Sequence, residues 1–100
     1  MSMITVLKEV VDERNRQDAK WGEQNHPDGT GLPTDRLLAT DYRKLCQLRA
    51  EQGTLTWSDI SREEMAEAYA ESEPTALRYE LIQQAAVIIA WIEAIDRRIK

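Results

Sequence analysis

The chain has 100 residues, with 18 acidic and 13 basic side chains and a net charge of −5. This length fits a single domain, residues 1–100, with a modest hydrophobic core, so we expect stability to be gained by forming a homodimer or homotetramer. The basic residues are spread from end to end of the chain. An acidic chain without a basic stripe argues against nucleic acids and anionic membranes as partners.

The number of cysteines and the length of the longest apolar run indicate the cellular compartment of the protein. The single cysteine, Cys46, has no intramolecular partner and lies in a helical pattern, which favours a buried, inert thiol and a reducing compartment. The N-terminus has no basic region followed by an apolar stretch, and the apolar run Ala85–Ile92 is far shorter than the roughly 20 residues that span a bilayer. We therefore predict a cytoplasmic protein.

The first predicted helix covers about residues 3–20. Val6, Leu7, Val10 and Val11 recur at helical spacing, and the segment from Asp12 onward is strongly polar. Such a pattern indicates a helix whose second half is solvated or lines a site.

A loop is predicted over residues 21–33, with the sequence WGEQNHPDGTGLP. Its Gly, Pro and Asn residues are those that interrupt helices. Connections in helical domains usually run about 2 to 8 residues. The greater length, together with a Trp and the only His of the chain, favours a binding loop.

A second helix is expected over about residues 35–51. Either Thr34 or Asp35 is suited to cap its start, and Gly53 is suited to end it. The apolar residues at helical spacing are Leu37, Leu38, Tyr42, Leu45 and Leu48.

The second half of the chain predicts two further helices. The third begins either at a Thr56–Asp59 capping box or at a Ser61–Glu64 box one turn later. The fourth starts at Pro74 and continues to the C-terminus. The stretch Ala85–Trp91 is apolar on every face, which indicates a helix buried all round and shared between subunits, and Trp57 and Trp91 are assigned to the core. The predicted class is all-α.

Acidic residues gather on the third predicted helix, where Glu63 and Glu64 lie one turn before Glu67. Like charges at this spacing destabilise a helix, so a cation that offsets them would be favoured. Glu80 and Gln83 share a face of the next helix, and an antiparallel turn between the helices would set them against the first group.

Mg²⁺ is the natural candidate, because it takes a few carboxylates together with water and phosphate oxygens. By spacing alone, a solvated acidic face is the commoner interpretation, and Glu64 has a second alternative as the capping partner of Ser61. Glu80 favours a site, because it precedes the apolar Leu81 and Ile82 and a carboxylate there needs a partner.

The sequence Glu63-Glu64-x-x-Glu67, followed by Glu80-Leu81-x-x, resembles the EExxE and ExxD motifs of MazG-like all-α nucleoside triphosphate pyrophosphohydrolases. The tail AAVIIAWIEAIDRR resembles their buried final helix, and the similarity covers about residues 57–98. The front segment ERNRQDAKWGEQNHPDGTG resembles the opening of small MazG-like proteins of phages and bacteria. It is more loosely similar to the Trp and His loop of dCTP pyrophosphatases.

This resemblance implies a four- to five-helix bundle completed by oligomerisation. It also implies Mg²⁺-dependent hydrolysis of a nucleoside triphosphate, in which four acidic side chains hold the metal and the products are the monophosphate and pyrophosphate. Glu64, Glu67 and Glu80 match three of these ligands, and Glu63 is the spare carboxylate suited to orient the attacking water. Where the family has Asp, this chain has Gln83, which offers a neutral carbonyl oxygen.

That departure leaves several alternatives open. The metal site would be weaker, or it would be completed by Glu63 or Glu71. Otherwise the chain has kept the fold as a catalytically degenerate nucleotide-binding or protein-interaction module.

The predicted loop supplies candidate substrate-binding residues. Trp21 beside Lys20 is suited to stack a base and contact phosphate, with His26 nearby, and the amides of Gln24 and Asn25 are suited to read a base edge. The alternative is that Trp21 fills the core and His26 is a turn residue.

Overall fold

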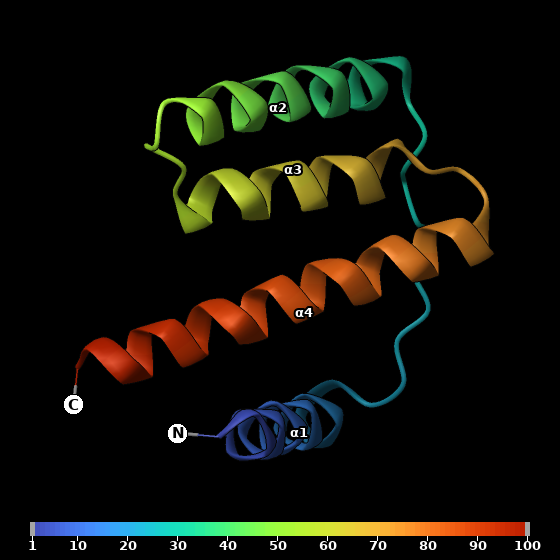
Figure 1. Cartoon of the computed structure of the whole chain (residues 1–100). Coiled ribbons are helices and arrows are strands. Elements are labelled where there is room, and N and C mark those ends of the chain that lie inside the picture. The colour runs from blue at the N-terminus through green and yellow to red at the C-terminus, as the bar shows by residue number, and fades with distance from the viewer. Residues whose placement is uncertain (1, 100) are drawn as a thin grey trace. The chain divides into compact units, whose positions relative to one another are not determined.

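In the computed structural model, residues 2–99 are described, and they form four α-helices and no strand (Figure 1). The helices are α1 (Met3–Trp21), α2 (Pro33–Glu51), α3 (Trp57–Ala70) and α4 (Pro74–Arg98). The predicted all-α class is therefore confirmed. Over the described residues, none of these helices has the length and apolar character needed to cross a membrane.

The chain divides into two units. The first contains α1, the loop as far as Asp28 and the part of α4 from Ile89 onward. The second, Gly29–Ile88, contains α2, α3 and the first part of α4. All the carboxylates that the sequence places in a metal site belong to this second unit.

The first helix follows its prediction to within one residue at its end. Ser2 caps its start, because the Ser2 hydroxyl accepts the backbone N–H of Thr5 at 3.2 Å. Gly22 ends it with a φ of 67°, and its N–H donates to the carbonyl of Asp18 at 2.8 Å. Val6 is buried, and the polar half of the helix is almost wholly exposed, as the sequence predicts.

The second helix starts two residues before its predicted boundary. Leu32 is the N-cap residue and Pro33 occupies the first helical position, where its fixed φ suits a helix and its missing N–H costs nothing. Thr34 is therefore not the cap. Asp35 acts from inside the first turn, where its carboxylate accepts the Leu32 N–H at 3.1 Å.

The third helix begins at the earlier of its two candidate boundaries. The Thr56 hydroxyl accepts the Asp59 N–H at 3.2 Å, and the Asp59 carboxylate accepts the Thr56 N–H at 3.1 Å. This reciprocal pair is a capping box. Ser61 consequently lies inside the helix, and Glu64 has no capping role.

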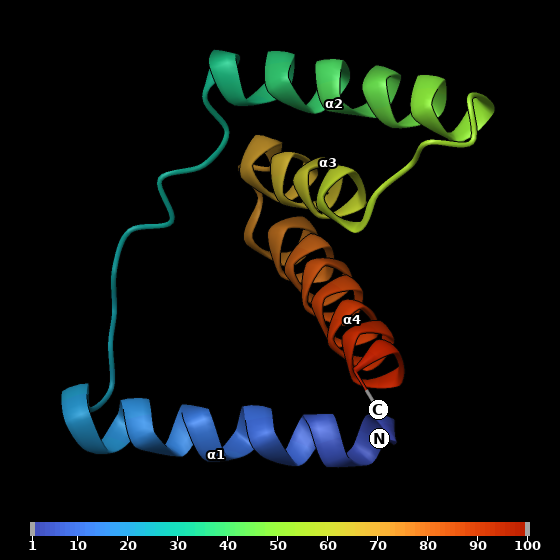
Figure 2. The same cartoon turned by 90° about the vertical axis from the view of Figure 1, so that its left-hand side faces the viewer.

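α2 and α3 lie side by side and run in opposite directions (Figures 1 and 2). Small buried side chains let helices approach closely, and Ala39, Cys46, Ala66 and Ala68 are all buried. The Cys46 thiol donates to the carbonyl of Asp59 at 3.1 Å. Burial, together with the neighbouring carboxylate of Glu63, raises the pKa of Cys46 to about 12, which agrees with an inert thiol.

An ion pair with one buried member also joins these two helices. Arg49 Nη1 of α2 lies 2.7 Å from Asp59 Oδ1, and the Asp59 side chain is fully enclosed. Burial alone would raise the pKa of Asp59. Hydrogen bonds from Thr56 and the positive charge of Arg49 outweigh burial and hold the pKa below its ordinary value of 3.8. The first turn of α3 is therefore fixed to α2.

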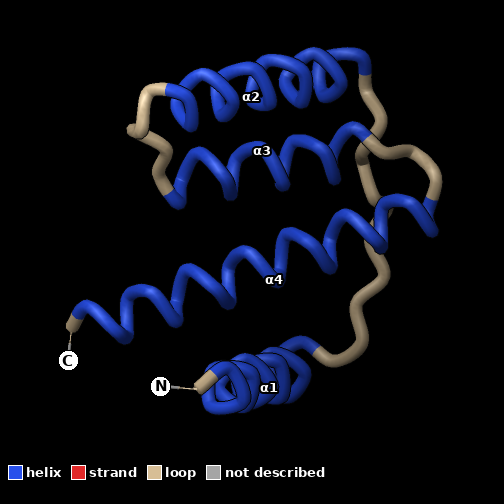
Figure 3. Tube along the Cα trace, in the orientation of Figure 1, coloured by secondary structure: helices blue, strands red, loops and turns tan. Residues whose placement is uncertain are grey.

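The loop before α2 is attached to the far end of α3 (Figure 3). Gly31 N–H donates to the carbonyl of Tyr69 at 2.8 Å, and the Thr30 hydroxyl donates to the carbonyl of Glu71. Gly31 has a φ of 81°, and a Cβ there would lie 2.6 Å from Cβ of Ser72. Only glycine therefore fits this approach.

The fourth helix starts at Pro74, as predicted, and the Glu73 carboxylate accepts the N–H groups of Thr75 at 3.0 Å and Ala76 at 2.9 Å. In the single chain this helix is not buried all round, and its predicted burial between subunits stays a prediction. Ala85 and Ala86 are exposed, as is Ile88, and Trp57 and Trp91 are half-buried rather than in the core. One chain has too few partner side chains to cover a helix that is apolar on every face.

Candidate metal centre

Three carboxylates of the second unit meet where α3 and α4 face each other. Glu64 and Glu67 lie on successive turns of α3, and Glu80 lies on α4. One carboxylate oxygen from each falls within 4.8 Å of the others. All three side chains are half-buried. The antiparallel turn at Pro74 produces the arrangement that the spacing predicts. We call these three residues the carboxylate cluster.

Burial and crowding both act on Glu64. Desolvation, followed by the negative charges of Glu67, Glu80 and Glu63, raises its pKa above the ordinary value of 4.5. Its carboxylate carries one oxygen, Oε2, that is buried without a hydrogen-bond partner among the described residues. The same is true of Glu80 Oε2. Buried polar atoms of native proteins are usually satisfied, so these two oxygens are suited to a cation or an ordered water.

The pKa of Glu67 is raised for similar reasons, and one cationic contact opposes the shift. Desolvation and the charges of Glu63 and Glu80 raise its pKa, while Arg43 lowers it in part. Nη2 of Arg43, on α2, lies 3.6 Å from Oε1 of Glu67. Sequence spacing gave no sign of Arg43, because its contact crosses from one helix to another and only the packing of α2 on α3 reveals it.

Glu63 lies near the carboxylate cluster but is not one of its three members. Its negative charge helps to raise the pKa of the Cys46 thiol on α2. Its charge is also close enough to raise the pKa of both Glu64 and Glu67. Glu71 is the first residue after α3 and is also outside the three. The described carboxylates thus offer three candidate metal ligands.

Two glutamines of α4 are candidates for a neutral fourth oxygen. Gln83 follows Glu80 by three residues and is half-buried, and its side chain makes no hydrogen bond within residues 2–99. Gln84 follows Glu80 by four residues, donates from Nε2 to the Ser61 hydroxyl at 3.4 Å, and has a buried Oε1 without a partner. The sequence singled out Gln83 alone. Because positions three and four residues apart share a helix face, Gln84 meets the same spacing criterion.

The candidate base-binding residues belong to the first unit and interact mainly with each other. Nζ of Lys20 lies 4.8 Å from the ring centre of Trp21, a cation–π contact. Nε2 of His26 lies 3.0 Å from Oε1 of Gln24, and Asn25 donates to Glu23 at 3.1 Å. Trp21 is 58% exposed, so the alternative of a core-filling Trp is not supported.

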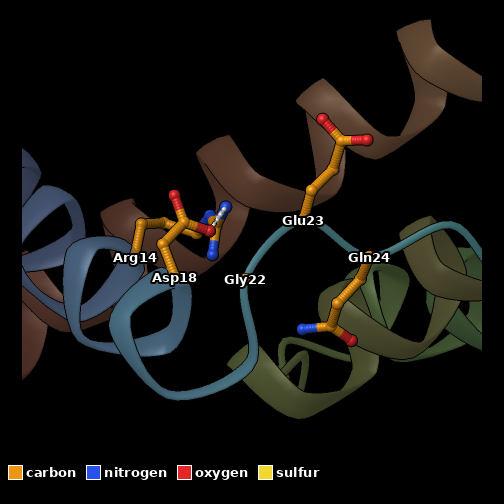
Figure 4. A pocket seen from close by; sticks show the side chains of 5 residues that line it. All are labelled: Arg14, Asp18, Gly22, Glu23 and Gln24. Carbon is orange, nitrogen blue, oxygen red and sulfur yellow. Dashed lines mark hydrogen bonds and ion pairs between the residues drawn. The ribbon is translucent and has the colours of Figure 1, made fainter.

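A pocket lies beside these residues at the end of α1 (Figure 4). Its lining residues are Arg14, Asp18, Gly22, Glu23 and Gln24. Arg14 is paired with Asp18 at 3.0 Å, and the side chains of Glu23 and Gln24 point in opposite directions (Figure 4). Of the predicted base-binding residues, Gln24 alone lines this pocket.

Compared with protein-family models, with curated proteins and with solved structures, the chain matches none of them. The chemistry that its own residues offer is a half-buried set of three oxygen ligands, with one cationic side chain at its edge. Oxygen ligands of this kind bind hard divalent cations.

Proposed function

We propose that this chain is a Mg²⁺-dependent nucleoside triphosphate pyrophosphohydrolase of the MazG-like type. The observation that supports it is the convergence of Glu64, Glu67 and Glu80 on one point between two antiparallel helices. Two of these carboxylates carry a buried oxygen without a protein partner. A solvated acidic face does not account for either feature, whereas a bound cation would account for both.

In the proposed reaction, a water oxygen attacks the α-phosphorus of a (d)NTP, the bond from that phosphorus to the α,β-bridging oxygen breaks, and pyrophosphate leaves. Mg²⁺ would supply positive charge that offsets the polyphosphate and acidifies the attacking water. Glu64, Glu67 and Glu80 would hold the metal. Glu63 remains as a carboxylate that can accept the proton of the water. The (d)NMP product keeps the new P–O bond.

The test is pyrophosphate release from a panel of NTPs and dNTPs in the presence of Mg²⁺. We expect turnover of at least one nucleotide, loss of turnover in Glu67→Ala, and retention in the control Glu51→Gln. Glu51 is an exposed carboxylate at the end of α2, outside the carboxylate cluster. A folded wild-type chain that releases no pyrophosphate from any nucleotide would refute the enzymatic proposal.

A second candidate is a nucleotide-binding or protein-interaction module on the same fold. The observation that favours it is Gln83, a neutral residue where the proposed family has a carboxylate. This alternative predicts Mg²⁺-dependent nucleotide binding without turnover. A third candidate, a purely structural helical oligomer, predicts that neither Mg²⁺ nor nucleotide shifts the melting temperature, because a ligand of the folded state must stabilise it.

Self-association and a cytoplasmic location belong to the same proposal. Large apolar side chains remain exposed on α2 and α4, and the fully buried core consists largely of small residues. A homodimer or homotetramer would cover such surface. The single buried thiol of Cys46 fits a reducing compartment.

A further inference from the structure

Arg43 differs from the arginine that holds α2 to α3. Arg49 makes a 2.7 Å contact with the enclosed carboxylate of Asp59. Arg43 lies 3.6 Å from Glu67, and its side chain is 50% exposed. Charge-assisted hydrogen bonds are about 2.8 Å long, so the contact of Arg43 is loose. Arg49 therefore stabilises the packing of α3 on α2, whereas Arg43 can leave Glu67 and pair with another anion.

A metal at the carboxylate cluster would weaken the contact between Arg43 and Glu67. The cation and the guanidinium would compete for the same carboxylate of Glu67, and their like charges would repel each other. Arg43 would then need another anion within reach of its side chain. A guanidinium offers five N–H donors in a planar fork that matches two oxygens of a phosphate.

We propose that Arg43 binds phosphate: it pairs with Glu67 before the metal arrives and with an oxygen of the metal-bound polyphosphate afterwards. This inference rests on the proposed function, because it needs a metal at the carboxylate cluster. It gives α2 a part in a site whose metal ligands come from α3 and α4. The packing of α2 on α3 sets the position from which Arg43 reaches that site.

The test uses inorganic tripolyphosphate, which carries the charge of a nucleotide triphosphate without a base. Isothermal titration calorimetry on the full chain measures Mg²⁺ binding alone, and then tripolyphosphate binding at saturating Mg²⁺. The variants are Arg43→Ala and Arg43→Lys, with Lys44→Ala as the control. Lys44 is an exposed cation on the same helix, turned by about 100° from Arg43. Melting curves establish that each variant is folded.

We expect Arg43→Ala to weaken tripolyphosphate binding roughly tenfold to a hundredfold, the loss typical of a hydrogen bond to a charged group. Arg43→Lys keeps the charge without the planar fork, so its affinity for tripolyphosphate should lie between those of the wild type and Arg43→Ala. Lys44→Ala should change binding by less than about threefold. The Mg²⁺ affinity of Arg43→Ala should equal or exceed that of the wild type, because a competing cation has been removed.

Two results separate the failure of this inference from the failure of the proposed function. If the wild-type chain binds Mg²⁺ and tripolyphosphate, and Arg43→Ala binds tripolyphosphate equally well or loses Mg²⁺ affinity, the phosphate role of Arg43 is wrong and the metal centre stands. If the wild-type chain does not bind Mg²⁺, the metal centre is wrong and the role of Arg43 falls with it.

Discussion

At the scale of single residues, the carboxylate cluster destabilises the folded chain when no metal is bound. Desolvation and mutual repulsion raise the pKa of Glu64 and of Glu67, which means that folding disfavours their charged forms. Arg43 relieves part of this for Glu67 and leaves Glu64 without a cationic partner among the described residues. A side chain held in an unfavourable state is common where a ligand supplies the compensation.

Replacing Glu64 by Gln should therefore stabilise the metal-free protein and remove its response to Mg²⁺. We expect the melting temperature at pH 7 to rise by about 2–6 °C, since each like-charge pair at this spacing costs a few tenths of a kcal/mol. Mg²⁺ should raise the melting temperature of the wild type but not of Glu64→Gln. Thermal denaturation with and without Mg²⁺ measures both effects, and a variant that melts lower than the wild type would contradict the repulsion.

The same cluster sets the sign of the pH dependence. An acid whose folded pKa is raised binds more protons in the folded state, so stability falls as pH rises through the interval above 4.5. Asp59 and Glu73 have lowered pKa values, so they stabilise the folded chain at pH values above their ordinary pKa values of 3.8 and 4.5. This stabilisation is lost as the pH falls below those values. The metal-free wild type should be more stable at pH 5 than at pH 7, with a smaller difference in Glu64→Gln.

Gln83 provides the converse experiment. Gln83→Asp adds a fourth carboxylate and should raise Mg²⁺ affinity about tenfold, while lowering the melting temperature of the metal-free chain by adding like charge. If the wild type is a degenerate binder, the same change should create or greatly raise turnover. Calorimetry and pyrophosphate release measure these effects. Gln47→Asp, an exposed site on α2, is the control, and equal effects in both variants would rule out a special role for Gln83.

At the scale of elements, the start of α3 controls where the carboxylate cluster lies. The first turn of α3 is capped by Thr56 and joined to α2 by the ion pair of Asp59 with Arg49. The C-terminal end of α3 is attached to the loop before α2 through Gly31 and Thr30. Both ends of α3 are thus fixed within the second unit. The positions of Glu64 and Glu67 depend on these attachments as much as on their spacing.

Asp59→Ala should consequently destabilise the whole second unit. It removes the carboxylate that accepts the Thr56 N–H in the capping box and leaves Arg49 without its buried partner, so we expect the melting temperature at pH 7 to fall by at least about 5 °C. Arg62→Ala is the control, because Arg62 lies 3.9 Å from Asp59 and is half-exposed. Circular dichroism melts compare the two, and similar small shifts in both would show that the cap carries little stability.

Much of this element structure could be predicted from the sequence, because the signals are local. Pro74, Gly53 and the Thr56–Asp59 box act on residues within a few positions of themselves. The convergence of Glu64, Glu67 and Glu80 was also predictable, since one tight turn joins their helices. The contact of Arg43 with Glu67 and the hydrogen bond of Gln84 to Ser61 were not, because they depend on how helices pack.

At the scale of the whole molecule, the apolar surface is the feature left unexplained by one chain. Leu81, Ile82 and Ile88 of α4 are each more than 40% exposed, although the sequence predicts that this helix is covered. Leu37 on α2 is 66% exposed. Apolar side chains of this size, left exposed by one chain, are suited to an interface between subunits.

Self-association should therefore be measurable and coupled to folding. We expect sedimentation equilibrium to give a dimer or tetramer, and the melting temperature to rise with protein concentration, because association stabilises only the folded chain. Ile82→Lys places a charge on the exposed apolar surface of α4 and should shift the equilibrium toward monomer, while Gln47→Lys adds the same charge at a polar position and should not. A wild-type chain that sediments as a monomer and melts independently of concentration would mean that this surface serves another purpose, because its exposure then persists in the functional state.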